Sequence, residues 1–277
     1  MPSDPAPEAL VVPVPGGGLA ADRWPGRPPT VVLLHAGVAD RRGWRPVAAR
    51  LSAAGHRVLA YDRRGFGDSP PSDDGGFTHL SDLEAVLTVA GTERVWLVGS
   101  SMGGLLALDA ALTLPDRLAG LVLLAPAVSG SPDPEPEALD AATRRLDENL
   151  EQAEDPEEVN RLEAWLWLDG PGEAEGRVSG EPRALARAMN AVILANQQDD
   201  DAGNAGLDAW GRLEEIRVPP VVAWGELDLP FLVEQSRAVA QRLPDAFGHE
   251  LPGTAHLPFL EAPEQVAQLV LDALGRR

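Results

Sequence analysis

The sequence predicts an α/β protein built on a mostly parallel, doubly wound sheet. Apolar, β-branched runs of strand length alternate with helical runs along the chain, a pattern typical of parallel sheets with helices on both faces. Residues 30–35 form one unbroken apolar run, as expected of a strand buried on both faces. A Gly-x-Ser-x-Gly turn at 99–103 separates a strand-like run from a helical run.

The first half of the chain contains most of the predicted sheet. Two short strands, 9–14 and 19–24, flank a glycine-rich turn and form a hairpin pattern. That turn lacks the following helix that a phosphate-binding loop needs. Further strands are predicted at 30–35, 57–62, 94–98 and 119–125, with helices at 44–54, 80–90 and behind residue 101.

The turn at 99–103 has the pattern of a nucleophile elbow, which lifts one hydroxyl clear of the sheet edge. Gly99 and Gly103 are needed because neighbouring backbone leaves no room for a Cβ atom. The helix behind Ser101 directs free N–H groups and its positive dipole end at any oxyanion formed there. The sequence therefore predicts Ser101 as a nucleophile.

The composition changes after residue 129. A proline-rich linker at 131–136 is followed by three helical patterns without an intervening strand. We expect an α-helical cap, or lid, inserted between two strands of the sheet. The predicted cap is 131–212, with helices at 137–152, 156–168 and 182–196, and the predicted core is 1–130 together with 213–277.

The sheet resumes after this insertion. Strands are predicted at 219–224 and 247–251, and helices at 231–243 and 263–274. The carboxyl ends of parallel strands share one edge of a sheet, and ligands bind at that edge. We therefore expect the functional site there, where His35, Asp62 and Ser101 follow their strands.

The composition excludes several kinds of chemistry. The chain has no cysteine, which excludes disulfides, thiolate metal ligands and a cysteine nucleophile. All its basic side chains are arginine, which excludes Schiff-base chemistry and a Walker lysine. A net charge of −20 without a basic stripe argues against binding nucleic acid or anionic lipid. There is no signal-peptide pattern and no run approaching about 18 apolar residues, so we expect a cytoplasmic protein without a membrane span.

An acidic turn at 199–204 is the one hint of a metal site. It lacks the alternating ligands and the distant glutamate of a calcium-binding loop. We interpret it as a solvated loop. The sequence predicts no metal and no cofactor.

The chain resembles the α/β-hydrolase family over nearly its whole length. The order Ser101, Asp228, His256 is the order of catalytic residues in that family. Residues 35–44 also resemble the corresponding segment of 3-oxoadipate enol-lactonase-like members. The segments that carry the family resemblance are 35–37, 62–69, 99–103, 225–228 and 253–256.

The resemblance implies a catalytic triad of Ser101 as nucleophile, His256 as general base and Asp228 as the acid that orients the imidazole. Glu226 follows the same strand two residues earlier, and in an extended chain both carboxylates can point the same way. The Gly-x-x-Asp pattern of the family selects Asp228.

The oxyanion loop departs from the family pattern. Most members have glycine directly after the strand-end histidine, whereas this chain has Ala36 and then Gly37. The resemblance therefore implies the backbone N–H groups of Gly37 and Met102 as the oxyanion donors.

The resemblance also implies structural roles for charged residues near this loop. His35 is expected to brace the oxyanion loop by hydrogen bonding. Asp62 is expected to pair with Arg63 or Arg64 and so to hold neighbouring loops together.

Residues beside these positions and in the cap are expected to bind the substrate. Trp165 and Trp167 lie two positions apart, so they cannot share a helix face. We expect one to face the site while the other packs the cap or meets solvent, and packing of both is the alternative. The predicted substrate-binding residues are Val38, Trp165, Trp167, Leu229 and Leu257.

The expected activity is that of a cofactor-free serine hydrolase that cleaves a small carboxylic ester or lactone through an acyl-enzyme. A serine nucleophile argues against haloalkane dehalogenases and epoxide hydrolases, which need aspartate there. Three alternatives stay open: a carbon–carbon bond hydrolase, a perhydrolase or cofactor-free haloperoxidase, and a ligand-sensing signalling protein on this fold. The sequence does not indicate which oligomeric state the protein adopts. An enol-lactone diacid would need cations near Ser101, for which the cap offers Arg144, Arg145, Arg161 and Arg187.

Overall fold

The computed structural model describes residues 6–72, 76–91, 93–132, 134, 139–196 and 203–276. One eight-stranded sheet forms its centre, made of β1 Glu8–Val14, β2 Gly17–Trp24, β3 Arg27–Leu34, β4 His56–Tyr61, β5 Val95–Ser100, β6 Leu118–Leu124, β7 Pro220–Gly225 and β8 Phe247–Leu251. The strand order is β1-β2-β4-β3-β5-β6-β7-β8. Strand β2 pairs antiparallel with β1 and β4, and all other neighbours are parallel. The predicted mostly parallel sheet is confirmed.

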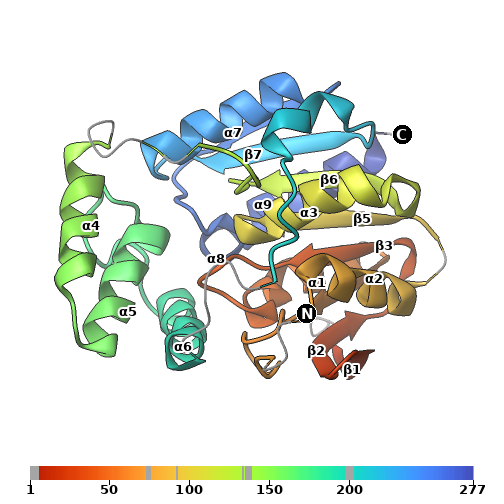
Figure 1. Cartoon of the computed structure of the whole chain (residues 1–277), viewed down its shortest axis with the longest axis horizontal. Coiled ribbons are helices and arrows are strands. Elements are labelled where there is room, and N and C mark those ends of the chain that lie inside the picture. Colours follow the sequence, from red (N-terminus) through yellow and green to blue (C-terminus); the bar gives the residue numbers. More distant parts are fainter. Residues whose placement is uncertain are drawn as a thin grey trace.

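Helices pack on both faces of this sheet (Figure 1). Successive strand residues point to opposite faces, so Val32 enters one hydrophobic core and Val31 the other. Helices α2, α3 and α7 complete the first core, and α1 and α9 the second. The helices are α1 Arg45–Ala53, α2 His79–Ala90, α3 Met102–Thr113, α4 Ala141–Gln152, α5 Pro156–Ala164, α6 Glu181–Asn196, α7 Pro230–Arg242, α8 Pro258–Glu261 and α9 Pro263–Gly275, with short 3-10 helices η1 Arg41–Trp44, η2 Pro115–Arg117 and η5 Trp210–Glu215.

Three of the helices lie together at one end of the molecule, on the left in Figure 1. They are α4, α5 and α6, which follow β6 and precede β7 as predicted. The Met189 sulfur of α6 accepts a hydrogen bond from the Asp40 backbone N–H at 3.4 Å. At the end of α6 the Asn196 amide donates to the Gly65 carbonyl at 2.7 Å. These contacts join the inserted helices to loops of the core, and their use as a lid stays a prediction.

The insertion differs in detail from its predicted helices. The predicted helix 156–168 is divided, because α5 ends at Ala164 and a π-helical turn, η4, spans Trp165–Asp169. The Gly170 N–H donates to the Trp165 carbonyl at 3.0 Å, five residues back. A single wide turn of this kind leaves the apolar spacing close to that of an α-helix, so a periodicity reading misses it. Residues 133, 135–138 and 197–202, which include parts of the predicted linker and acidic turn, lie outside the described residues.

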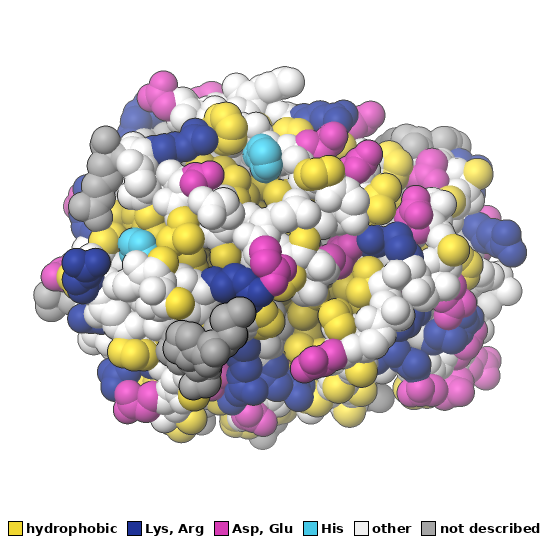
Figure 2. Space-filling model, turned by 180° about the vertical axis from the view of Figure 1, so that it is seen from behind, with side chains coloured by type: hydrophobic (Ala, Val, Ile, Leu, Met, Phe, Trp, Pro, Cys, Tyr) yellow, Lys and Arg dark blue, Asp and Glu magenta, His cyan; other side chains and the backbone are white. Residues whose placement is uncertain are grey.

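Charged side chains of both signs share the surface. Figure 2 shows arginine interspersed with aspartate and glutamate over one face of the molecule. Ion pairs between exposed side chains include Arg237 with Glu250 and Arg242 with Glu214. In the described part of the chain, no helix is both long and apolar enough to cross a membrane.

A buried carboxylate joins the two ends of the insertion to the core. Asp109 of α3 is 1% exposed, and it accepts a hydrogen bond from the Ser129 hydroxyl at 2.7 Å. The Ser129 Oγ atom in turn accepts from the Ala209 N–H at 3.1 Å, and the Ser129 carbonyl accepts from the Trp210 N–H at 2.9 Å. Residues 129 and 209 lie just before and just after the inserted helices. Burial raises the pKa of Asp109 to about 6.

The raised pKa of Asp109 predicts a pH-dependent loss of stability. The folded state keeps this proton between about pH 4 and pH 6 while the unfolded state loses it, so the free energy of unfolding falls as pH rises through that window. Asp109→Asn removes the charge and keeps an acceptor for Ser129. The variant should be more stable than wild type above pH 6 by on the order of 1–3 kcal/mol, and the difference should vanish below about pH 4.

Urea unfolding at pH 4, 5 and 7 measures this difference. The exposed Asp147 of α4 provides the matched control as Asp147→Asn. A stability difference between Asp109→Asn and wild type that does not change with pH would contradict the prediction.

Candidate active site

Ser101 lies in a strained turn between β5 and α3. Its backbone has φ 51° and ψ −114°, a conformation that non-glycine residues rarely adopt. The turn is tightly enclosed by backbone: a Cβ on Gly99 would lie 2.2 Å from the Gly103 carbonyl oxygen, and one on Gly103 would lie 2.2 Å from the Leu34 carbonyl oxygen. Both contacts are shorter than any tolerated carbon–oxygen distance, which explains the two glycines.

Hydrogen bonds to neighbouring strands hold this turn in place. The Ser101 N–H donates to the Leu124 carbonyl at 2.9 Å, and the Ser101 carbonyl accepts from the Ala127 N–H at 3.1 Å. The Gln235 amide of α7 donates to the Pro126 carbonyl at 2.9 Å. The serine is thus tied to β6 and, through the segment after β6, to α7.

His256 and Asp228 form a buried pair at the same edge of the sheet. Asp228 follows β7 and His256 follows β8, and the side chains are 0% and 3% exposed. The imidazole Nδ1 lies 2.9 Å from the Asp228 Oδ2 atom. An ionised carboxylate can only accept hydrogen bonds, so the proton of this contact is on Nδ1 of the imidazole. The lone pair on Nε2 is then left to act as a base. The other carboxylate oxygen accepts from the Leu229 N–H at 2.7 Å.

Glu226 points elsewhere. Its carboxylate accepts a hydrogen bond from the Gly253 backbone N–H at 2.9 Å, at an exposed position. Of the two acids that follow β7, the structure brings Asp228 and not Glu226 to the imidazole.

The Ser101 hydroxyl makes no hydrogen bond within the described ranges of the chain, to His256 or to any other residue. The structure therefore brings two of the predicted triad residues into contact and places the third at the same sheet edge. Hydrogen bonds between nucleophile and base are often long in free enzymes and tighten when substrate binds. The catalytic roles of the three residues stay predictions.

The predicted oxyanion donors lie close together. A Cβ on Gly37 would lie 3.3 Å from the Met102 Cγ atom, so the loop after β3 contacts the first residue of α3. The backbone N–H of Met102 is at a helix start, where N–H groups have no partner within the helix. The two N–H groups are candidates for one anion site.

His35 braces this loop, as expected. The Arg63 backbone N–H donates to His35 Nε2 at 3.0 Å, so the proton is on Nδ1, which lies 2.8 Å from the Ala36 carbonyl oxygen. Burial and the nearby Arg63 cation hold the pKa of His35 well below its ordinary value, so the ring is neutral at pH 7. The Ala36 carbonyl belongs to the same peptide as the Gly37 N–H, and its hydrogen bond therefore orients that donor.

The predicted partner of Asp62 was wrong. Asp62 forms its ion pair with Arg41 of η1, which also pairs with Asp22 and Asp68. Arg64 pairs instead with Asp82 of α2 at 2.7 Å. Successive residues after β4 point in different directions, and the sequence spacing alone did not show that η1 supplies the cation.

The predicted substrate-binding residues divide into two groups. Val38, Trp167 and Leu257 line one small cavity between the core and the inserted helices, together with residues of α5 and α6. The Trp167 and His256 rings lie 4.9 Å apart between centroids. Leu229 and Trp165 belong to a neighbouring hydrophobic cluster, and the Trp165 indole N–H donates to the Glu173 carbonyl at 2.9 Å. Trp167 borders this cluster as well and in addition contacts His256, whereas Trp165 packs only in the cluster, between the insertion and the segment around Leu229.

Sequence reasoning missed two charged residues that hold the His256 loop. Both carboxylate oxygens of Glu261 accept from the Ala255 N–H, at 2.9 and 3.1 Å, and Glu261 pairs with Arg177 of the insertion. Arg177 also donates to the Gly253 carbonyl at 3.0 Å. Burial raises the pKa of Glu261 to about 7 although Arg177 opposes the shift. No motif in the sequence joins positions 177 and 261, so only the fold reveals the pair.

The cap arginines predicted as cations for an anionic substrate have other partners. Arg161 pairs with Glu158 and Glu175, and Arg187 pairs with Glu157. Arg144 donates to the Leu139 carbonyl, and Arg145 is exposed on α4. Among the described residues, no group of three or more acidic or histidine side chains could hold a metal ion.

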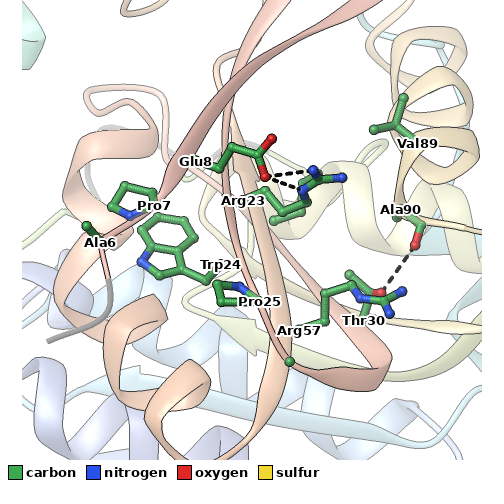
Figure 3. A pocket seen from close by; sticks show the side chains of 12 residues that line it. Ala6, Pro7, Glu8, Arg23, Trp24, Pro25, Thr30, Arg57, Val89 and Ala90 are labelled. Carbon is green, nitrogen blue, oxygen red and sulfur yellow. Dashed lines mark hydrogen bonds and ion pairs between the residues drawn. The ribbon is translucent and has the colours of Figure 1, made fainter.

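A larger hollow lies at the opposite edge of the sheet (Figure 3). Trp24, Thr30 and Arg57 line it, and the Glu8–Arg23 ion pair, 2.7 Å long, is part of its wall. Thr30 and Arg57 lie near the amino ends of β3 and β4, whereas Ser101, Asp228 and His256 follow the carboxyl ends of their strands. This hollow is therefore separate from the candidate active site.

Comparison with known proteins gives consistent matches. The sequence profile described as "Alpha/beta hydrolase family" matches residues 31–269. The chain is 29% identical over 255 residues to a pimeloyl-[acyl-carrier protein] methyl ester esterase of Yersinia enterocolitica, covering 87% of this chain and 92% of that protein. It is 27% identical over 263 residues to a 2-hydroxy-6-oxo-6-phenylhexa-2,4-dienoate hydrolase of Burkholderia cepacia. This match covers 90% of this chain and 89% of that protein.

Solved structures resemble the whole fold. An esterase from Thermogutta terrifontis superposes with a TM-score of 0.75 at 25% identity, covering 97% of this chain and 98% of that one. Three observations point to the same family: the order of strands in the sheet, the strained turn at Ser101, and the family match over residues 31–269. This chain belongs to the alpha/beta hydrolase family.

Proposed function

We propose that this protein is a serine hydrolase that cleaves a small carboxylic ester or lactone through an acyl-enzyme, without a cofactor. The observation that carries the proposal is the buried Asp228–His256 hydrogen bond of 2.9 Å at the sheet edge where the strained Ser101 turn lies. A neutral imidazole with its proton on Nδ1 can accept a proton at Nε2, as a serine nucleophile requires.

The proposed reaction has two halves. Ser101 Oγ attacks the substrate carbonyl carbon while His256 Nε2 accepts the hydroxyl proton, and Asp228 stabilises the imidazolium that forms. The N–H groups of Met102 and Gly37 donate to the oxyanion, and each such donor typically contributes about 2.7–4 kcal/mol to transition-state stabilisation. His256 then gives its proton to the leaving alcohol oxygen. A water molecule attacks the acyl-enzyme in the same way and releases the acid and Ser101.

The substrate is proposed to bind between the core and the inserted helices, which act as a lid. Val38, Trp167 and Leu257 would contact it directly, while Leu229 and Trp165 support the apolar wall. The Yersinia relative is named as a methyl ester esterase and the Thermogutta neighbour as an esterase, which supports an ester substrate. The apolar side chains of Val38, Trp167 and Leu257 fit an acyl chain.

A carbon–carbon bond hydrolase is the second candidate, since the Burkholderia cepacia relative is named as a hydrolase of a dienoate. Both activities use the same proposed triad, so geometry does not separate them. A panel of p-nitrophenyl esters, lactones and a 2-hydroxy-6-oxo-dienoate, assayed side by side, tests which bond is cleaved. Cleavage of the dienoate with no ester turnover would favour the second candidate.

One test of the proposed function concerns the nucleophile. Ser101→Ala should fold normally and lose on the order of 10⁴–10⁶ in kcat on a good ester, because the attacking oxygen is gone. A fluorophosphonate probe should label wild type and leave this variant unlabelled. Ser100→Ala is the matched control, since Ser100 is buried beside the turn and should keep the labelling. Persistent labelling of Ser101→Ala would refute the assignment.

The next prediction separates the two acids after β7. Asp228→Asn should lower kcat by on the order of 10⁴, because an amide favours the wrong imidazole tautomer. Glu226→Gln should cost much less, since the Glu226 carboxylate accepts a hydrogen bond from the Gly253 N–H and not from the imidazole. Steady-state kinetics of both variants on one ester compare them. Near-normal activity in Asp228→Asn with collapse in Glu226→Gln would transfer the role to Glu226.

Another test uses the two tryptophans as a matched pair. Trp167→Ala removes a wall next to His256 and should change the kcat/KM ratio between p-nitrophenyl butyrate and octanoate by about tenfold or more. Trp165→Ala removes packing between the insertion and the segment around Leu229, away from the His256 ring, and should lower stability while leaving that ratio close to wild type. Equal changes of the ratio in both variants would argue against a specific contact by Trp167.

A further inference from the structure

A single arginine of the insertion, Arg177, joins the insertion to the core. Its Nε–H donates to the Asp169 carbonyl at 2.7 Å and its Nη2 group to the Leu168 carbonyl at 2.8 Å, both within η4. Its Nη1 group donates to the Gly253 carbonyl at 3.0 Å, and Nη2 also forms the ion pair with Glu261. Every nitrogen of this guanidinium therefore has an acceptor, and the acceptors lie on both sides of the boundary between insertion and core.

The position of Arg177 is fixed by the insertion itself. Asp169 is 0% exposed, and its carboxylate accepts from the Gly176 N–H at 2.8 Å and from the Val178 N–H at 2.9 Å. Arg183 of α6 pairs with the same carboxylate. The backbone on both sides of Arg177 is thus bound to one buried group, which limits the directions that the guanidinium can take.

On the core side, Glu261 holds the backbone next to His256. Glu261 is the last residue of α8, and its side chain is 3% exposed. Both carboxylate oxygens accept from the N–H of Ala255, at 2.9 and 3.1 Å, and Ala255 directly precedes His256. Hydrogen bonds to an ionised carboxylate are shorter and stronger than those to a neutral acceptor. The ionised Glu261 therefore fixes the chain one residue before the imidazole.

The insertion also packs against the turn that carries Asp228. A Cβ on Gly170, the residue after η4, would lie 2.4 Å from the Leu227 carbonyl oxygen, so the backbones meet closely there. The Leu227 N–H donates to the Thr254 carbonyl at 2.8 Å, which joins this turn directly to the His256 loop. One part of the insertion therefore contacts both segments whose side chains form the Asp228–His256 hydrogen bond.

The charge of Glu261 depends on Arg177. Burial raises the pKa of Glu261 to about 7, the Arg177 cation opposes this shift, and the Asp228 carboxylate adds to it. Without Arg177 the neutral acid would be favoured still more, because a buried carboxylate is costly without a counter-charge. Other charged side chains on the elements packed against α8 have partners of their own, among them Arg50 with Glu264, Arg41 with Asp62, Arg183 with Asp169 and Arg187 with Glu157. Arg177 is the cation that pairs with Glu261.

We propose that Arg177 and Glu261 are positioning residues for the base of the proposed reaction, so that docking of the insertion completes the alignment of His256 with Asp228. Arg177 keeps Glu261 ionised, Glu261 fixes the backbone at Ala255, and the imidazole follows at the next residue. The insertion then aligns the base as well as covering the substrate, as closing elements of enzymes often do. The inference rests on the proposed serine hydrolase function and names a regulation of that same site.

Kinetics of matched variants measure this effect. Glu261→Gln keeps an oxygen acceptor for the Ala255 N–H and removes the charge, whereas Arg177→Met removes the cation and its donors. On p-nitrophenyl acetate each variant should lose on the order of 10–100-fold in kcat, because a small misplacement of a catalytic group is costly. Arg177→Lys should recover part of the loss, since it restores a cation. Arg161→Met removes ion pairs elsewhere in the insertion and should keep the wild-type kcat.

The pH profile distinguishes alignment of the base from simple packing. Glu261 loses its charge as pH falls through about 7, and protonation of His256 removes the base as well. The acid side of the kcat profile should therefore require two ionisations in wild type and one in Glu261→Gln. A wild-type profile that a single ionisation describes, and that Glu261→Gln shares, would overturn the proposal.

A measurement without turnover keeps the positioning role separate from the proposed function. The Nδ1 proton between His256 and Asp228 gives a strongly downfield proton NMR signal, which Asp228→Asn identifies by its loss. The signal should weaken or broaden in Arg177→Met and in Glu261→Gln, and stay unchanged in Arg161→Met. If wild type hydrolyses no ester or lactone while the signal depends on Arg177, the positioning role is supported and the proposed function is refuted. If wild type hydrolyses esters while both variants keep its kcat and its signal, the proposed function stands and the positioning role is refuted.

Thermal unfolding separates loss of alignment from loss of the fold. Removing one partner of a buried ion pair lowers stability, so each variant is assayed well below its unfolding temperature. Arg177→Met decides if Glu261→Gln does not fold, because the Arg177 side chain is 21% exposed and that of Glu261 only 3%. Lower stability with a wild-type kcat and an unchanged signal would limit the pair to holding the fold together and overturn the proposal.

Discussion

The strained backbone at Ser101 is the constraint on which the rest of the site depends. A serine at φ 51° costs on the order of 1–3 kcal/mol, and it persists only where the surroundings enforce it. Here β3, β6 and α3 enforce it together, since Gly99 and Gly103 allow backbone contacts that any side chain would prevent. The strained turn leaves Ser101 half-buried at the sheet edge and starts α3 directly behind it, so one turn positions both the proposed nucleophile and one oxyanion donor.

The loops around this turn are oriented by buried charges. Arg41, Arg64 and Glu261 each join two segments that are distant in the sequence through ion pairs that are largely shielded from water. Such pairs add little net stability, because desolvation cancels much of their attraction, but breaking one leaves a costly unpaired charge. Their effect is therefore to specify loop positions. Arg63 stands apart from this pattern, because no carboxylate among the described residues pairs with it and its guanidinium donates to the Ala36 carbonyl.

The insertion is coupled to the proposed base at two points. Trp167 packs beside the His256 ring, and Arg177 binds both Glu261 and the Gly253 carbonyl of the His256 loop. A movement of the inserted helices would therefore change the surroundings of the imidazole as well as the walls of the cavity. In the proposed function, substrate selection and catalytic geometry would therefore share the same contacts.

The sequence by itself determined the sheet, the serine turn and the order of the candidate triad, because these depend on local patterns: apolar strand runs, glycines in a tight turn and short motifs after strands. Contacts between distant segments were decided only by the tertiary structure. The choice of Arg41 over Arg63 as partner of Asp62, the Arg177–Glu261 pair and the π-helical turn at Trp165–Asp169 left no periodic signal. Side-chain direction after a strand depends on what packs against it, and that is a property of the folded chain.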